Sequence, residues 1–167
     1  IVLQHGNNPG LVSHFVKAGI AYIVQKQFRG DKALKALVHQ GKFNEAAQAL
    51  GLRMIHVNDV DLQEISDAYS DENLYSTWCT DSFWFEMLSE ATASIGTHEE
   101  IKDKEGCNFI NKDTGSLEFK KLAADKKGKT YYPGGVFTGH LVPHEETITI
   151  AQNLEVVEEG KVVYRPT

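Results

Sequence analysis

Helical periodicity fills the first fifty residues of this chain, and short strand-like runs dominate the remainder. Apolar residues recur at helical spacing over residues 11–28, which predicts an amphipathic helix. Asp31 is a favourable N-cap for a second helix over Lys32–His39, and residues 44–50 form a third helical pattern closed by Gly51. Two more helices are predicted over residues 83–91 and 144–153. The former is apolar on nearly every side, so we expect it to be deeply buried.

The strand-like runs are short, and turn residues separate several of them. They cover residues 52–57, 74–80, 131–132, 136–142 and 154–164, the last as a hairpin turning at Glu159-Gly160. Residues 116–122 are predicted as a short strand or a turn, and the charged stretches 99–106 and 124–128 as loops. Helices and strands do not alternate regularly, which favours the α+β class over a doubly wound α/β sheet. We expect a mixed, largely antiparallel sheet flanked by helices.

A length of 167 residues suits one domain with a real hydrophobic core. The chain begins within an apparent strand at Ile1 and stops within another, residues 162–167. We therefore expect residues 1–167 to be a single domain excised from a longer protein. The sequence has no GxGxxG turn, P-loop, nucleophile elbow or metal-ligand cluster. A Rossmann domain for a dinucleotide would lie outside these residues, and no metal site is predicted.

The net charge of −6 argues against nucleic acid or an anionic membrane as a partner. No apolar run approaches the roughly 18 residues that a membrane span needs. Cys79 and Cys107 do not form a CxxC pair, which favours reduced thiols and a cytoplasmic location.

The turn before the first helix, residues 5–10 (HGNNPG), is a candidate ligand loop. Enzymes of the α/β kind place ligands where such a turn joins a strand to a helix. Pro9 restricts Asn8 to extended geometry, which aims the Asn8 amide away from the helix and toward a cofactor or substrate. The alternative is that Asn8 caps backbone donors at the helix entry.

Trp78 and Glu86 are candidates for binding a cation. Trp78 offers a cation–π surface for an ammonium group, or else it fills the core. Glu86 is embedded in the apolar string of residues 83–88, where a carboxylate either faces solvent or is buried and paired. A buried and unpaired carboxylate there would receive a cationic substrate.

Two further sets of polar residues follow predicted strands. Asp59 and Asp61 share one side of the chain at the two-residue period, as in an ammonium or metal receptor or in an ordinary acidic loop. His140 and His144 flank a strand-to-helix junction. A histidine there either shuttles protons near neutral pH or serves as a cap or core residue.

Four motifs in order carry a family resemblance. Residues 5–15 (HGNNPGLVSHF) look like the HGANPG-[LM]-V-S-x-F stretch of bacterial homospermidine synthases, relatives of saccharopine dehydrogenases, with Asn7 in place of the usual Ala. Thr77-Trp78, Glu86 and residues 96–99 (GTHE) are similar to the TW…E…GTHE pattern of that family. Residues 139–150 resemble its G…HxE/xNE-x-x-[ST]-I segment, and residues 162–167 its VYRPT. The resemblance spans nearly the whole chain.

The resemblance implies an NAD-dependent aminobutyl transferase that makes homospermidine from putrescine, alone or with spermidine as donor. One amine is oxidised to an imine by hydride transfer to NAD, a second amine attacks the imine, and NADH returns the hydride. This chain would be the substrate-side domain, with polyamines as ligands and a homodimer as the implied assembly. We expect it to be inactive alone, because the missing Rossmann domain would hold most of the NAD.

The same resemblance implies roles for individual residues. Trp78 matches a substrate-contacting tryptophan, Glu86 the carboxylate after it, and His144 the histidine of the later segment; these three are the predicted catalytic residues. Asn8 matches an asparagine near the nicotinamide and is the predicted cofactor contact. Asp59 is a third predicted substrate-binding residue beside Trp78 and Glu86, although it is one methylene shorter than the glutamate expected there.

Two other functions remain open from the sequence. A related saccharopine or carboxynorspermidine dehydrogenase would act on carboxylate substrates and would need Arg or Lys at its site. Arginine is scarce here (Arg29, Arg53 and Arg165), which favours a diamine. The other alternative is a non-catalytic domain for dimerisation or polyamine sensing.

Overall fold

A computed structural model of the chain defines residues 10–58, 70, 72, 79–101, 105–132 and 134–167. Its helices are α1 (Leu11–Gln27), α2 (Lys32–His39), α3 (Phe43–Ala49), α4 (Thr80–Leu88), α5 (Glu146–Asn153) and a short 3-10 turn η1 (Ala123–Asp125). Its strands are β1 (Glu90–Ser94), β2 (Cys107–Asn111), β3 (Ser116–Leu122), β4 (Lys127–Tyr132), β5 (Gly135–His140), β6 (Val156–Glu158) and β7 (Lys161–Tyr164).

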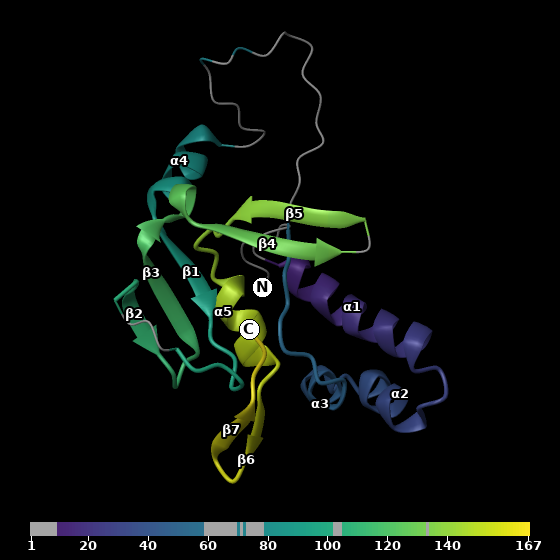
Figure 1. Ribbon diagram of the computed structural model, residues 1–167. Coiled ribbons are helices and arrows are strands. Elements are labelled where there is room, and N and C mark those ends of the chain that lie inside the picture. Colours follow the sequence, from purple (N-terminus) through teal and green to yellow (C-terminus); the bar gives the residue numbers. More distant parts are fainter. Residues whose placement is uncertain (1–9, 59–69, 71, 73–78, 102–104, 133) are drawn as a thin grey trace, which may run out of the picture.

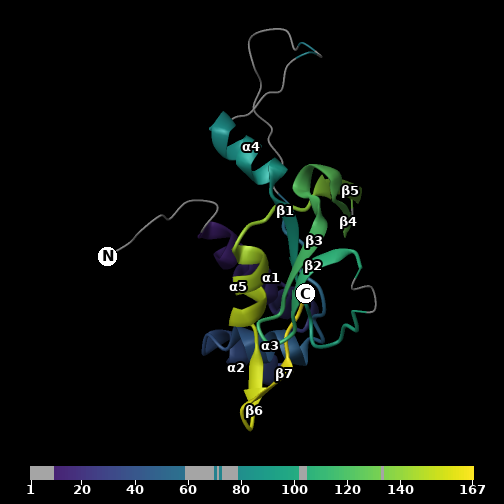
Figure 2. The same ribbon diagram turned by 90° about the vertical axis from the view of Figure 1, so that its left-hand side faces the viewer.

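The strands form three separate sheets, and every pairing among the described residues is antiparallel. One sheet has the order β1-β3-β2, while β4-β5 and β6-β7 are two-stranded hairpins. Helix α5 lies between the three-stranded sheet and the cluster of α1, α2 and α3 (Figures 1 and 2). The β4-β5 hairpin crosses above, and the β6-β7 hairpin projects below (Figure 1). The predicted α+β class is confirmed, with separate sheets in place of one.

Helices α1, α3 and α5 share the main apolar core. Its buried members are Ile20, Ala46, Ala47 and Leu154. Partly buried residues of α2 and of the chain after α3 pack around them. The Asp31 carboxylate caps α2 by accepting from the Leu34 amide at 3.0 Å, as predicted.

Arg165 fixes the three-stranded sheet to α5 and to the C-terminal strand. It is only 4% exposed, and its guanidinium donates to the carbonyls of Ile95, Lys112 and Asp113 at 2.8, 2.7 and 3.1 Å. It also pairs with the Glu155 carboxylate at 2.8 Å. Such a buried charge is tolerated because its donors are satisfied and its charge is paired.

Gly115, in the turn between β2 and β3, leaves the room that Arg165 occupies. A Cβ at this position would lie 2.4 Å from the Arg165 Cζ atom, and Gly115 has a φ of 68°. Both the left-handed backbone and the close approach therefore require glycine here.

The sequence motifs at residues 96–99 and 162–167 meet in space. The Thr97 amide donates to the Arg165 carbonyl at 2.9 Å, and the Arg165 amide donates to the Thr97 hydroxyl at 3.1 Å. The Glu99 carboxylate accepts from the Gly96 amide at 2.8 Å and also from the Thr167 hydroxyl. These two motifs build a structural joint between the end of β1 and the chain after β7.

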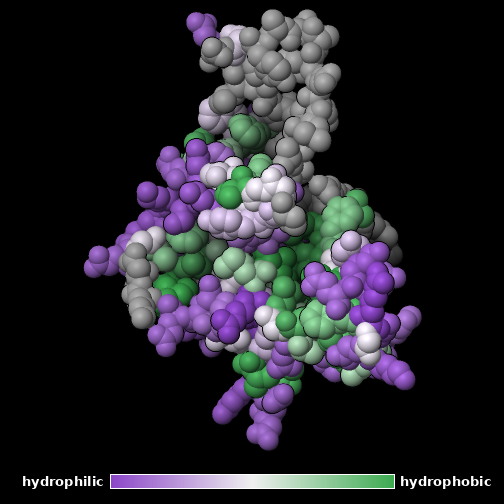
Figure 3. Space-filling model, turned by 45° about the vertical axis from the view of Figure 1, so that its right-hand side comes forward, coloured by the Kyte–Doolittle hydropathy of each residue, from purple (hydrophilic) through white to green (hydrophobic). Residues whose placement is uncertain are grey.

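The predicted burial of the helix near residue 83 is wrong. Helix α4 runs from Thr80 to Leu88 and has no buried residue, and Ala91 belongs to β1. None of the aromatic side chains in the described part of the chain is buried. Figure 3, which draws one face of the molecule, shows hydrophobic residues at the surface across the centre of that view. The apolar sequence of α4 indicates that its surface packs against another apolar surface. It does not specify that the described residues provide that surface.

Other sequence predictions are confirmed or corrected by the backbone hydrogen bonds. Residues 116–122 form a strand, and the C-terminal hairpin turns at Glu159 and Gly160, with φ of 49° and 77°. Both φ values suit a two-residue hairpin turn. The loop predicted over residues 124–128 is wrong in its last part, because β4 begins at Lys127. Strands β1 and β2 have no counterpart among the predicted strands.

Residues 52–57 do not form the strand that their composition predicts. They run beside the end of the chain, where the Ile55 amide donates to the Thr167 carbonyl and the Thr167 amide donates to the Arg53 carbonyl, each at 2.8 Å. The Tyr164 hydroxyl donates to the Leu52 carbonyl at 2.7 Å. These hydrogen bonds are too few to make residues 52–57 a β-strand, but they hold the segment beside β7.

The partly buried phenol of Tyr164 is expected to lower the free energy of unfolding at alkaline pH. Burial raises the pKa of Tyr164 to about 12. In the unfolded chain the phenol ionises at about pH 10. The contribution of the buried, neutral phenol to the free energy of unfolding is therefore complete below that pH and is lost as the pH rises toward 12. Urea denaturation from pH 9 to 12 is expected to show a shallower loss for Tyr164→Phe than for wild type. The exposed Tyr131→Phe is the control and should keep the wild-type slope; equal slopes for all three would contradict the assignment.

Candidate functional site

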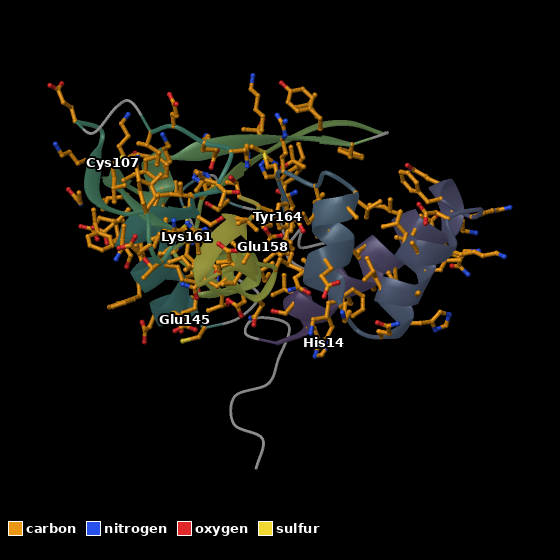
Figure 4. All side chains as sticks on the ribbon, turned by 90° about the horizontal axis from the view of Figure 1, so that it is seen from below. His14, Cys107, Glu145, Glu158, Lys161 and Tyr164 are labelled. Carbon is orange, nitrogen blue, oxygen red and sulfur yellow. The ribbon has the colours of Figure 1, made fainter. Side chains whose placement is uncertain are left out.

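Glu86 and His144, both predicted site residues, lie together in the structure. The Glu86 Oε2 atom is 3.7 Å from the His144 Nε2 atom, and the two side chains are 27% and 28% exposed. One comes from α4 and the other from the connection between β5 and α5. Glu145, which is labelled in Figure 4, follows His144 and is the N-cap residue of α5. The sequence assigns both residues to one site, and the fold brings them into contact.

Local structure holds each partner of this pair. On α4, Glu86 shares the half-buried side with Phe83 and Met87, while the neighbouring Phe85 is 79% exposed. The His144 amide donates to the Val142 carbonyl at 2.9 Å. The backbone before α5 is thus turned so that the imidazole points toward α4.

The separation of 3.7 Å suits an amine ligand. It is too long for a good hydrogen bond between the two side chains. It still allows a single nitrogen to lie about 2.8 Å from both Glu86 Oε2 and His144 Nε2. As an ammonium group, such a nitrogen would donate one hydrogen bond to the carboxylate and a second to a neutral imidazole, which accepts it. The pair can therefore hold a cationic amine and take a proton from it.

The other predicted site residues are not tested by the structure. Asn8, Asp59 and Trp78 lie outside the described residues. His140, considered as a proton shuttle, contacts the Ala123 carbonyl through Nδ1 at 3.1 Å. This contact links β5 to η1, which is the structural alternative for that histidine.

Cys79 is an exposed thiol at the start of α4. Hydrogen bonds from the Ser82 backbone amide and hydroxyl, and from the Asp81 amide, lower the pKa of the Cys79 thiol. The first turn of a helix favours a thiolate in this way. Its position, seven residues before Glu86, places a nucleophilic group on the same helix as the candidate site.

The described residues do not build a nucleotide-binding fold or a metal site. Dinucleotide-binding folds present a phosphate loop between a strand of a parallel sheet and a helix, and all sheets defined here are antiparallel. No group of three or more metal-ligating side chains occurs within the defined ranges of the chain. Among those same residues, no helix has the length and apolar character needed to cross a bilayer. The described residues therefore supply no phosphate-binding loop of the dinucleotide-binding kind.

Comparisons of sequence and of structure both find homospermidine synthases. No family model matches the chain. Homospermidine synthase from Mesorhizobium japonicum is 29% identical over 180 aligned positions, which cover 100% of this chain and 35% of the relative. The enzyme of the same name from Blastochloris viridis is 27% identical over 97% of this chain and 34% of its own length. The crystal structure of homospermidine synthase from Legionella pneumophila in complex with NAD superposes with a TM-score of 0.78 at 28% identity, over 97% of this chain and 35% of that one.

The chain is similar over nearly all of its length to one part of these homospermidine synthases. It spans about a third of the length of the relatives that it matches. The predicted resemblance to homospermidine synthases and the α+β class are thus confirmed.

Sequence reasoning missed the role of Arg165. The sequence presents it only as one of few arginines that a carboxylate substrate could use, yet its guanidinium is buried and engaged by four groups of the fold. Arg29 is exposed in the connection between α1 and α2, at the opposite end of the molecule from α4 (Figure 1). The signal for Arg165 is present, since it lies within one of the motifs shared with homospermidine synthases.

Proposed function

We propose that this chain is the substrate-side domain of an NAD-dependent homospermidine synthase, excised from a longer polypeptide. The observation that carries the proposal is the contact between Glu86 and His144. These residues belong to two separate motifs of the resemblance, and α4 and the β5–α5 connection bring them to 3.7 Å. The similarity to three homospermidine synthases supports the same function.

In this proposal the two side chains have different tasks. The Glu86 carboxylate holds the attacking amine of putrescine while that amine is still an ammonium, since a half-desolvated carboxylate binds a cation more strongly than an exposed one. His144 takes a proton from the attacking amine, which must be neutral to act as a nucleophile. Trp78 supplies an aromatic face for the cationic imine and Asp59 a second carboxylate. Asn8 is proposed to lie near the nicotinamide.

The cofactor enters the proposal from outside this chain. NAD would be held mainly by a Rossmann domain in the remaining length of the polypeptide, where it would accept and return the hydride. We further propose a cytoplasmic bacterial homodimer that acts on putrescine and spermidine.

The reductase alternative is less well supported. A saccharopine or carboxynorspermidine dehydrogenase needs a cation for the carboxylates of its substrate. Arg165 is committed to the fold, and the candidate site presents Glu86 instead. The negative charge of Glu86 attracts the ammonium groups of a diamine and repels a carboxylate substrate.

Product analysis separates the candidate functions. The longer polypeptide that contains this segment is incubated with NAD and putrescine, and the amines are identified by mass spectrometry. Two putrescine molecules are expected to give one homospermidine and one ammonia, with no net consumption of NAD. The 167-residue chain alone should give no product. Carboxylate-dependent oxidation of NADH without homospermidine would identify a reductase, and polyamine binding without turnover would identify a non-catalytic domain.

A further inference from the structure

Helix α4 carries an apolar face that no described residue covers. Trp84, Phe85 and Leu88 are 50%, 79% and 55% exposed. They lie on one side of the helix, because positions three and four apart are neighbours on a helical surface. With Asp81 and Ser89 they line a shallow hollow of about 330 Å³. This outer face is opposite the side that carries Glu86.

The helix lacks the means to be stable alone. It has nine residues, and none of them is buried. Isolated helices shorter than about 12 residues are marginal in water. Its ties to the described fold include the Ala123 amide, which donates to the Ser89 carbonyl at 2.8 Å, and the pair of Glu86 with His144. A helix that positions a substrate carboxylate needs apolar packing in addition to such polar ties.

We propose that the outer face of α4 is covered by the rest of the longer polypeptide, through an apolar surface that packs on Trp84, Phe85 and Leu88. This rests on the proposed function in one respect, that the segment works as part of a longer chain. The relatives are about three times as long as the region they share with this chain, so covalently attached surface is available. The apolar centre with Asp81 and Ser89 at its margin has the anatomy of an interface.

A second copy is a poorer occupant for this face. A stable association between separate chains buries about 1,200–2,000 Å² and must offset the loss of translational and rotational freedom. Three side chains of one short helix supply only part of that area. Attached surface acts at high effective concentration, so a small patch is sufficient.

Covering this face also affects the candidate site. Packing that immobilises α4 fixes the Glu86 carboxylate against His144 and reduces the water that reaches the pair. Both side chains are more than a quarter exposed in this chain alone.

Hydrogen–deuterium exchange of the longer polypeptide tests the inference. The α4 amides are followed in wild type, in Phe85→Ser, and in Val157→Ser as a matched control on β6, where Val157 is 56% exposed. We expect protected α4 amides in wild type and in Val157→Ser, and about tenfold or more faster exchange in Phe85→Ser. Since the readout is protection and not turnover, a polypeptide that protects α4 but makes no homospermidine would refute the proposed function alone.

Two results would overturn the inference. Exchange of the wild-type α4 amides at the rate of an unprotected helix would show that nothing covers the face. Protection that increases with protein concentration, with a matching rise in mass by light scattering, would assign the face to a second copy.

Discussion

Replacing Arg165 with methionine is expected to lower the free energy of unfolding by about 4 kcal/mol, because it leaves a partly buried carboxylate and three carbonyls without their donor. The carboxylate is that of Glu155, and the carbonyls belong to the end of β1 and to the β2–β3 turn. Methionine keeps most of the volume, so the loss reports the polar contacts and not a cavity. Urea denaturation followed by circular dichroism measures the change.

The exposed Arg53→Met is the matched control and should change the free energy of unfolding by less than about 0.5 kcal/mol. A double-mutant cycle with Glu155→Gln isolates the ion pair, and the coupling should be favourable. If Arg165→Met behaved like the Arg53 variant, Arg165 would not be the joint between the sheet and α5.

Replacing Glu86 with glutamine in the longer polypeptide is expected to reduce homospermidine formation by about a hundredfold or more. Glutamine keeps the shape of the side chain but removes the charge that holds the ammonium group. His144→Gln should cause a loss of similar size, since it removes the group that takes the proton. Turnover with putrescine, measured under saturating NAD, checks both.

The double variant distinguishes a working pair from two separate contributions. If Glu86 and His144 act on the same nitrogen, the double variant should lose little more than either single variant. Glu90→Gln, an exposed carboxylate at the start of β1, is the control and should retain wild-type turnover. Wild-type rates in Glu86→Gln would remove this carboxylate from the site.

Local sequence signals are sufficient for elements stabilised by nearby residues. The Asp31 cap and the Glu159-Gly160 turn act over a few positions, and both elements lie where the sequence predicts them. Strand β1 escapes prediction because its partner β3 lies well beyond it in the sequence, and β2 escapes it although its partner β3 follows directly after a short turn. The pattern of residues 90–94 and 107–111 is not strongly apolar, so only the sheet reveals them.

The candidate site is predicted by motifs and not by periodicity. Glu86 and His144 belong together because two motifs of one family contain them, and the structure supplies their separation. Arg165 and Glu99 belong to motifs of the same family, but their role is a network among distant backbone groups. No local pattern encodes such a network. The exposure of Phe85 is unpredictable for a related reason, since apolarity does not specify which surface covers it.

The joint built by residues 165–167 has a consequence for synthesis on the ribosome. Arg165 satisfies carbonyls at the end of β1 and in the β2–β3 turn, and Thr167 pairs with the segment after α3. Both partners are translated long before these residues emerge. The sheet and the helical cluster must therefore wait, incompletely packed, until the last turn of this stretch leaves the exit tunnel, and chaperone binding is expected to fall sharply at that nascent-chain length.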